Sequence, residues 1–168
     1  MLIETKLHAP VARKEWVERQ ELIDYLASTK AKLVLIDAPA GFGKTTLAAQ
    51  WRSSAIGDRS FAWVSLDRGD DDPSRLWWHV VCALHLACPG FDSEKILRAL
   101  HAQVPDFDET VLPMLVNELA ALAKPVVLML DDYHLIKARR CHDQMTLLLD
   151  HLPSSARVMM ATWADDGK

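Results

Sequence analysis

The sequence has few cysteines and no long hydrophobic run, and each absence excludes a class of protein. Its 168 residues include only three cysteines, Cys82, Cys88 and Cys141, which cannot form the disulfide framework of a small secreted domain. Apolar runs such as Val126–Leu130 are far shorter than the ~20 residues of a membrane span. The first residues contain no apolar signal-peptide core. We therefore expect a cytoplasmic protein that has no membrane partner.

An excess of positive charge is also absent. The 19 Lys and Arg residues are outnumbered by 23 Asp and Glu residues, which gives a net charge of −4. Proteins that bind nucleic acid usually have a basic face, so we expect no DNA binding by this chain alone. The composition is 50% hydrophobic and 25% charged, which excludes a disordered chain and is typical of a globular domain.

Short apolar runs alternate with amphipathic stretches, which predicts an α/β fold with a mostly parallel sheet. We expect strands at 33–36, 61–66, 126–130 and 157–162, and helices at 18–29, 44–53, 74–88, 93–103, 110–123 and 139–151. The run Leu33–Ile36 has no polar alternation and is expected to be buried on both faces. Residues 1–20 are predicted to be irregular, and Asp70–Asp72 to form a solvated loop. We divide the chain into an arm with one helix, residues 1–30, and a core domain, residues 31–168.

A glycine-containing motif between the first strand and the second helix is the strongest functional signal. It matches the phosphate-binding pattern G-x-x-x-x-G-K-[ST], except at its first position, and consists of Ala38, Pro39, Ala40, Gly41, Phe42, Gly43, Lys44, Thr45 and Thr46. The two glycines permit backbone torsions that turn successive N–H groups towards an anion, and the helix N-terminus adds to this attraction. We expect Lys44 to contact the β- and γ-phosphates, Thr45 to bind Mg²⁺ and Thr46 to reach another phosphate oxygen.

Two carboxylates, Asp131 and Asp132, follow the third expected strand. A carboxylate at the end of such a strand can bind Mg²⁺ together with Thr45, so Asp131 is the second predicted metal ligand. Asp132 is a candidate for polarising an attacking water, which would make it catalytic together with Lys44. An N-cap for the segment that follows is an equally good explanation of Asp132.

A possible zinc site is excluded by helix geometry. His79, Cys82, His85 and Cys88 recur at three-residue steps, and on a helix they spread over about half of its circumference. Four ligands in this arrangement cannot converge on one tetrahedral metal ion. We therefore expect these side chains to be packing residues.

The motifs together resemble the N-terminal nucleotide-binding domain of MalT-like, LuxR-family regulators, which are STAND-type P-loop ATPases. Besides the P-loop, the resemblance rests on three stretches: 5–19 with Pro10, Arg13 and Arg19; 63–75 with Asp70–Pro73; and 130–136. It implies a P-loop NTPase three-layer sandwich that binds Mg²⁺ and ATP and serves in signal transduction and transcription regulation. It also implies self-association, or association with full-length paralogues, and it places Arg13 or Arg19 near the adenine.

The chain departs from the family pattern in two ways. The family has a Thr-Arg pair after the fourth strand whose arginine senses the γ-phosphate, but here Thr162 precedes Trp163, a neutral side chain. The family also continues into a fifth strand, a sensor region and a helix-turn-helix, so we expect a fragment, a truncated paralogue or a broken gene product. The sheet would then be truncated before its last edge strand, leaving 33–36 as an edge.

The motifs are compatible with three biochemical functions. The first is a Mg-ATP-binding regulatory module that is at most a slow ATPase, because Trp163 cannot replace the arginine. The second is a P-loop small-molecule kinase, although the sequence has no Arg-rich lid segment. The third is a degenerate interaction module that binds no nucleotide.

Overall fold

The computed structural model describes residues 4–11, 13, 15, 17–55 and 57–163, and its centre is a parallel sheet. The four strands of the described chain are β1 (Leu33–Asp37), β2 (Ser60–Ser65), β3 (Val126–Asp131) and β4 (Ala156–Thr162). Their order is β1-β4-β3-β2, and every neighbouring pair is parallel. The predicted α/β fold is thereby confirmed.

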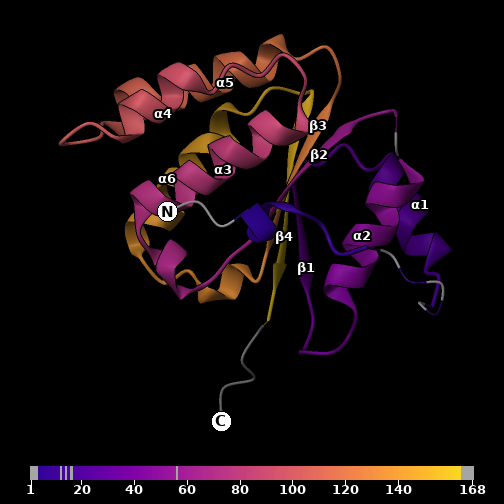
Figure 1. The fold of residues 1–168 in the computed structure, drawn as a ribbon. Coiled ribbons are helices and arrows are strands. Elements are labelled where there is room, and N and C mark those ends of the chain that lie inside the picture. The colour runs from indigo at the N-terminus through magenta and orange to yellow at the C-terminus, as the bar shows by residue number, and fades with distance from the viewer. Residues whose placement is uncertain (1–3, 12, 14, 16, 56, 164–168) are drawn as a thin grey trace.

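Helices cover both faces of this sheet (Figure 1). On one face lie α1 (Gln20–Ser28) and α2 (Lys44–Ser54); on the other lie α3 (Pro73–Ala87), α4 (Glu94–Leu100), α5 (Leu112–Ala121) and α6 (Arg139–His151). Shorter turns are the 3-10 helices η1 (Glu4–Leu7), η2 (Arg68–Asp71) and η4 (Tyr133–Leu135), and the π-helical turn η3 (Phe107–Val111). Within the described residues, no helix has the length and apolar character that crossing a membrane requires.

The hydrophobic core is divided by the sheet into two clusters. Side chains alternate along a strand, so Leu128 and Leu130 of β3 pack on the α3 side, whereas Val127 and Met129 pack on the α2 side. Every residue of β3 is buried. A central parallel strand therefore has the continuous apolar sequence that two-sided burial requires.

Strand β1 differs from the prediction of a fully buried strand. Within the described chain it pairs only with β4, and its residues alternate between exposed and half-buried. Leu35 is 56% exposed and Leu33 is 39% exposed. Two-sided burial is wrong here because only Val34 and Ile36 pack against a core cluster, the one on the α2 side, whereas Leu33 and Leu35 lie on the other face and belong to neither cluster. The expectation of an edge strand at 33–36 is confirmed for the described chain.

The N-terminal arm is more ordered than the sequence predicts. Residues Glu4–Leu7 form η1, in which Lys6 and Leu7 are buried. Leu7 packs with the core cluster on the α3 side, whereas Ala9 packs against the cluster on the α2 side. Because β2 is the other edge strand, the arm crosses its free edge between these two residues.

Candidate functional site

The glycine-containing loop lies between the end of β1 and the start of α2. Gly41 and Gly43 have φ angles of 82° and 75°, which are left-handed conformations that favour glycine. Gly43 is also the N-cap residue of α2. A Cβ atom at Gly43 would lie 3.3 Å from a guanidinium nitrogen of Arg19. The two glycines therefore have the conformational role that the motif predicts.

The side chain of Lys44 folds back over this loop. Its ammonium donates hydrogen bonds to the carbonyl oxygens of Ala38, at 2.5 Å, and of Pro39, at 3.0 Å. These contacts keep a positive charge at the mouth of the loop, next to the N-terminus of α2. The arrangement can attract an anion, which would compete with the two carbonyl oxygens for the ammonium.

The two predicted metal ligands, Thr45 and Asp131, are in direct contact. The Thr45 hydroxyl donates to Oδ2 of Asp131 at 2.8 Å, although the residues are 86 positions apart in the sequence. Asp131 is 5% exposed at the carboxyl end of β3, and its Oδ1 accepts a bond from the amide of Asp132. Burial raises the pKa of the Asp131 carboxyl, because little water surrounds the charged form.

Asp132 has an unusual backbone conformation. Its φ angle of 58° is the only positive value among the described non-glycine residues. Its side chain is exposed and makes no capping hydrogen bond to η4, although it occupies the N-cap position. Side-chain capping therefore does not explain Asp132, and strained residues of this kind are concentrated at functional sites.

Arg19 is the arginine of the N-terminal arm that reaches the loop. Its guanidinium donates to the carbonyl oxygen of Phe42 at 2.9 Å. Gln50 of α2 donates to the carbonyl oxygen of Val17 at 2.9 Å and so fixes the segment that precedes Arg19. Arg13 is exposed. Of the two arginines that the resemblance indicates, the structure brings Arg19 to the site.

Trp163 lies beside the start of the loop. Thr162, at the end of β4, is in register with Asp37, at the end of β1. The residues that follow them, Trp163 and Ala38, therefore leave the sheet side by side. The indole is 43% exposed and makes an edge contact with the His134 ring, with centroids 5.9 Å apart. Nδ1 of His134 is buried and has no hydrogen-bond partner among the described residues. His134 lies in η4 beside the end of β4, and no sequence motif singles it out.

The acidic stretch Asp70–Asp72 is not the solvated loop that was predicted. Asp70 is fully buried and accepts hydrogen bonds from the Lys6 ammonium and, at 2.8 Å, from Nδ1 of His79. Burial raises the pKa of Asp70, but these hydrogen bonds outweigh it and hold the pKa at about 2. The donors lie 64 and 9 positions away, so the run of aspartates itself does not reveal its partners.

The other two carboxylates of this stretch have separate structural roles. Asp71 accepts hydrogen bonds from the amides of Lys137 and Ala138, both at 2.6 Å, and these bonds lower its pKa. Asp72 accepts from the amide of Arg75 and caps α3. No cluster of three or more potential metal ligands occurs among the described residues. The expectation that His79 is a packing residue of α3 agrees with its burial.

Comparison with known proteins finds sequences that are similar to nearly the whole of this chain. The chain is 37% identical over 154 residues to the HTH-type transcriptional regulator MalT of Cronobacter sakazakii, and 36% identical over 161 residues to MalT of Serratia proteamaculans. The alignments cover 91% and 95% of this chain. The predicted resemblance to MalT-like regulators is confirmed.

The chain is much shorter than these relatives. The chain spans only 17% of each MalT protein. No family model matches the chain. A Walker-type ATPase of Pyrococcus abyssi has a similar fold, with a TM-score of 0.57 and 13% identity, over 93% of this chain and 48% of that one. The MalT-like sequence therefore adopts the fold of a P-loop ATPase.

Proposed function

We propose that this chain is a Mg-ATP-binding signal-transduction module of a MalT-like transcriptional regulator. The observation that carries the proposal is the hydrogen bond between Thr45 and Asp131, which joins the start of α2 to the end of β3. This contact brings together two oxygen ligands of the kind that Mg²⁺ prefers. The MalT relatives and the P-loop ATPase fold support the same assignment.

The donor set fits a divalent cation. Asp131 is a buried carboxylate whose only described side-chain partner is the Thr45 hydroxyl, and burial makes its negative charge costly. A cation held by these two groups would remove that cost. When bound, Mg²⁺ would supply positive charge to the phosphate oxygens of ATP.

The remaining residues of the site would hold the nucleotide. The amides from Gly41 to Thr46 would surround the phosphates, and Lys44 would exchange its two carbonyl acceptors for phosphate oxygens. Arg19 would keep the loop in position through the Phe42 carbonyl. The exposed carboxylate of Asp132 would orient a water molecule.

We further propose that ATP is bound but hydrolysed slowly. Phosphoryl transfer needs positive charge on the γ-phosphoryl oxygens, and an additional arginine is worth ~10³–10⁵ in rate in other P-loop enzymes. Here the residue after β4 is the neutral Trp163. Lys44 and Mg²⁺ would supply only part of the required charge.

Calorimetric titration with ATP and Mg²⁺ tests the proposal. We expect saturable binding by the chain and at least a hundredfold loss of affinity in Lys44→Ala, because that variant removes the charge at the loop. Lys95→Ala, at an exposed position of α4, is the matched control and is expected to bind as the wild type does. Equal affinities of all three proteins would contradict the role proposed for Lys44, and no binding by the wild type would support the degenerate interaction module. Phosphorylation of an added acceptor would support the kinase.

A further inference from the structure

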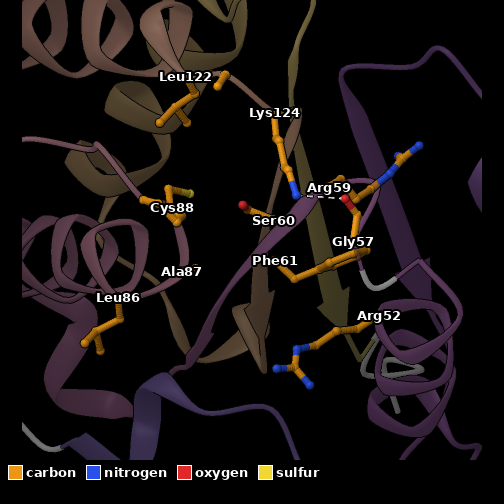
Figure 2. A pocket seen from close by; sticks show the side chains of 12 residues that line it. Arg52, Gly57, Arg59, Ser60, Phe61, Leu86, Ala87, Cys88, Leu122 and Lys124 are labelled. Atoms are coloured by element: carbon orange, nitrogen blue, oxygen red, sulfur yellow. Dashed lines mark hydrogen bonds between the residues drawn. The ribbon is translucent and has the colours of Figure 1, made fainter.

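A second cavity lies at the opposite end of the sheet from the glycine-containing loop. It has a volume of about 480 Å³ and borders β2, which is an edge strand (Figure 2). Ser60 begins β2, and Lys124 lies just before β3, so the cavity is at the amino ends of these strands. The loop follows the carboxyl end of β1, and all strands are parallel. The cavity is therefore separate from the proposed nucleotide site.

One part of the cavity wall is apolar. Figure 2 shows Leu86, from the end of α3, and Leu122, which follows α5, on the side opposite Phe61 of β2. Leu86 is 57% exposed, which is unusual for a leucine in a helix that otherwise packs on the core. These side chains can cover the apolar part of a ligand and would lose exposure to water when it binds.

The remaining wall is positively charged. Arg52, Arg59 and Lys124 line the cavity, and none of its lining residues, all of which the structure describes, is an acid. None of the three cations forms an ion pair within the described chain. The Lys124 ammonium is held in place by a 2.9 Å hydrogen bond to the carbonyl oxygen of Gly57. The Lys124 charge is thus held in position, and no acid of the described chain neutralises any of the three charges.

The surroundings of Arg59 add to this local excess of positive charge. Its Nε atom is buried without a hydrogen-bond partner among the described residues. Burial, followed by the nearby charge of Arg59, lowers the pKa of Arg157. Both guanidinium groups lie over the Trp51 ring, at 5.5 and 5.9 Å from its centroid. In a chain with a net charge of −4, this concentration of unpaired cations favours an anionic ligand.

We propose that the cavity binds a small amphipathic anion, in which a carboxylate or phosphate group is joined to an apolar chain or ring. The anionic group would lie near Arg52 and Lys124, and the apolar part would lie against Leu86, Leu122 and Phe61. The volume is in the range of small-molecule sites, which is about 300–1,000 Å³. Binding at this place would fix the ends of α2 and α3 relative to β2.

Calorimetric titration of the chain with octanoate and octyl phosphate, below their micellar concentrations, tests this proposal. Octyl glucoside supplies the same apolar chain without charge, and inorganic phosphate supplies the charge alone. We expect both octyl anions to bind at least tenfold more tightly than either control compound. Arg52→Gln/Lys124→Gln should weaken octyl phosphate at least tenfold, whereas the matched double variant Arg68→Gln/Lys95→Gln, at exposed positions, should bind as the wild type does. Lys44→Ala should also bind normally, because it alters the other end of the sheet.

A second variant protects the test against loss of folding. Leu86→Glu changes an exposed residue of the wall, so the fold is expected to persist, and its negative charge should reduce octyl phosphate binding at least tenfold. Equal binding of octyl glucoside and octyl phosphate, or wild-type affinity in both cavity variants, would overturn the proposal. So would binding of phosphatidylglycerol vesicles with no binding of octyl phosphate, because that result indicates a membrane surface rather than a small-molecule site.

Discussion

Replacing Asp70 by asparagine is expected to lower the free energy of unfolding by about 3 kcal/mol at pH 7. The carboxylate is fully buried and accepts hydrogen bonds from Lys6, from His79 and from the amide of Asp67. Nε of Arg75 lies 3.4 Å from Oδ1 of Asp70. Asparagine has nearly the same shape but no charge, so the buried Lys6 ammonium would lose its buried anionic partner and keep only the half-exposed carboxylate of Asp67, at 3.0 Å. Breaking a buried ion pair in this way costs about 3–5 kcal/mol.

The pKa of Asp70 gives a second estimate of this magnitude. It is lowered from 3.8 to about 2, and one pKa unit corresponds to about 1.36 kcal/mol. The charged form thus contributes about 2 kcal/mol to stability at neutral pH. Because the folded pKa is the lower one, this contribution is complete well above pH 3.8. It disappears as the pH falls from 3.8 through about 2.

Urea unfolding followed by circular dichroism, at pH 7 and at pH 2.5, measures both effects. The loss in Asp70→Asn should be about 3 kcal/mol at pH 7 and clearly smaller at pH 2.5. Asp72→Asn is the matched control, because this exposed residue only caps α3, and it should cost about 1 kcal/mol or less. An Asp70→Asn protein within 0.5 kcal/mol of the wild type at pH 7 would refute the reasoning, as would a loss that is independent of pH.

Three further predictions concern the proposed nucleotide site and the sheet edge. Asp131→Asn removes the charged metal ligand, so the ATP affinity measured by calorimetry should fall at least tenfold with Mg²⁺ but less than threefold in EDTA. Equal losses of affinity under the two conditions would argue against metal binding by Asp131. Leu35→Lys places a charge on the exposed face of the edge strand β1, so self-association seen by sedimentation velocity should decrease, and an unchanged sedimentation coefficient distribution would contradict this. Trp163→Arg places a positive charge beside the loop. It should raise the single-turnover rate of ATP hydrolysis at least tenfold or raise the affinity for ATP relative to that for ADP. No change in either quantity would show that Trp163 does not occupy a sensor position.

The sequence predicts the elements around the loop well, because each has a local cause. The apolar run before Asp131 predicts a central strand, and β3 is buried throughout. The glycines at 41 and 43 predict positive φ angles, which the structure has. The apolar run at 33–36 gives the same local signal but a different outcome. Whether core residues cover both faces of a strand depends on where the strand lies in the sheet, which the run itself does not encode.

Long-range polar contacts are the part that sequence reasoning missed. A run of three aspartates is usually a solvated surface, and nothing local indicates that the first of them is buried. The one available signal was His79, a titratable residue among the apolar positions of α3, which pairs with Asp70. Likewise, the choice between Arg13 and Arg19 required the path of the arm over α2, which the contact between Gln50 and Val17 fixes.

The short acidic segment after β2 therefore does more than connect a strand to a helix. Asp70 holds Lys6, and the arm that begins there continues to Arg19, which bonds the glycine-containing loop at Phe42. Asp71 holds the amide of Lys137, just after the segment that contains Asp132 and His134. Both sides of the proposed nucleotide site are thus tied to neighbouring residues of one short segment, in which Asp70 is buried. Asp70→Asn therefore alters a segment to which both sides of the proposed site are joined, although Asp70 makes no contact with the loop itself.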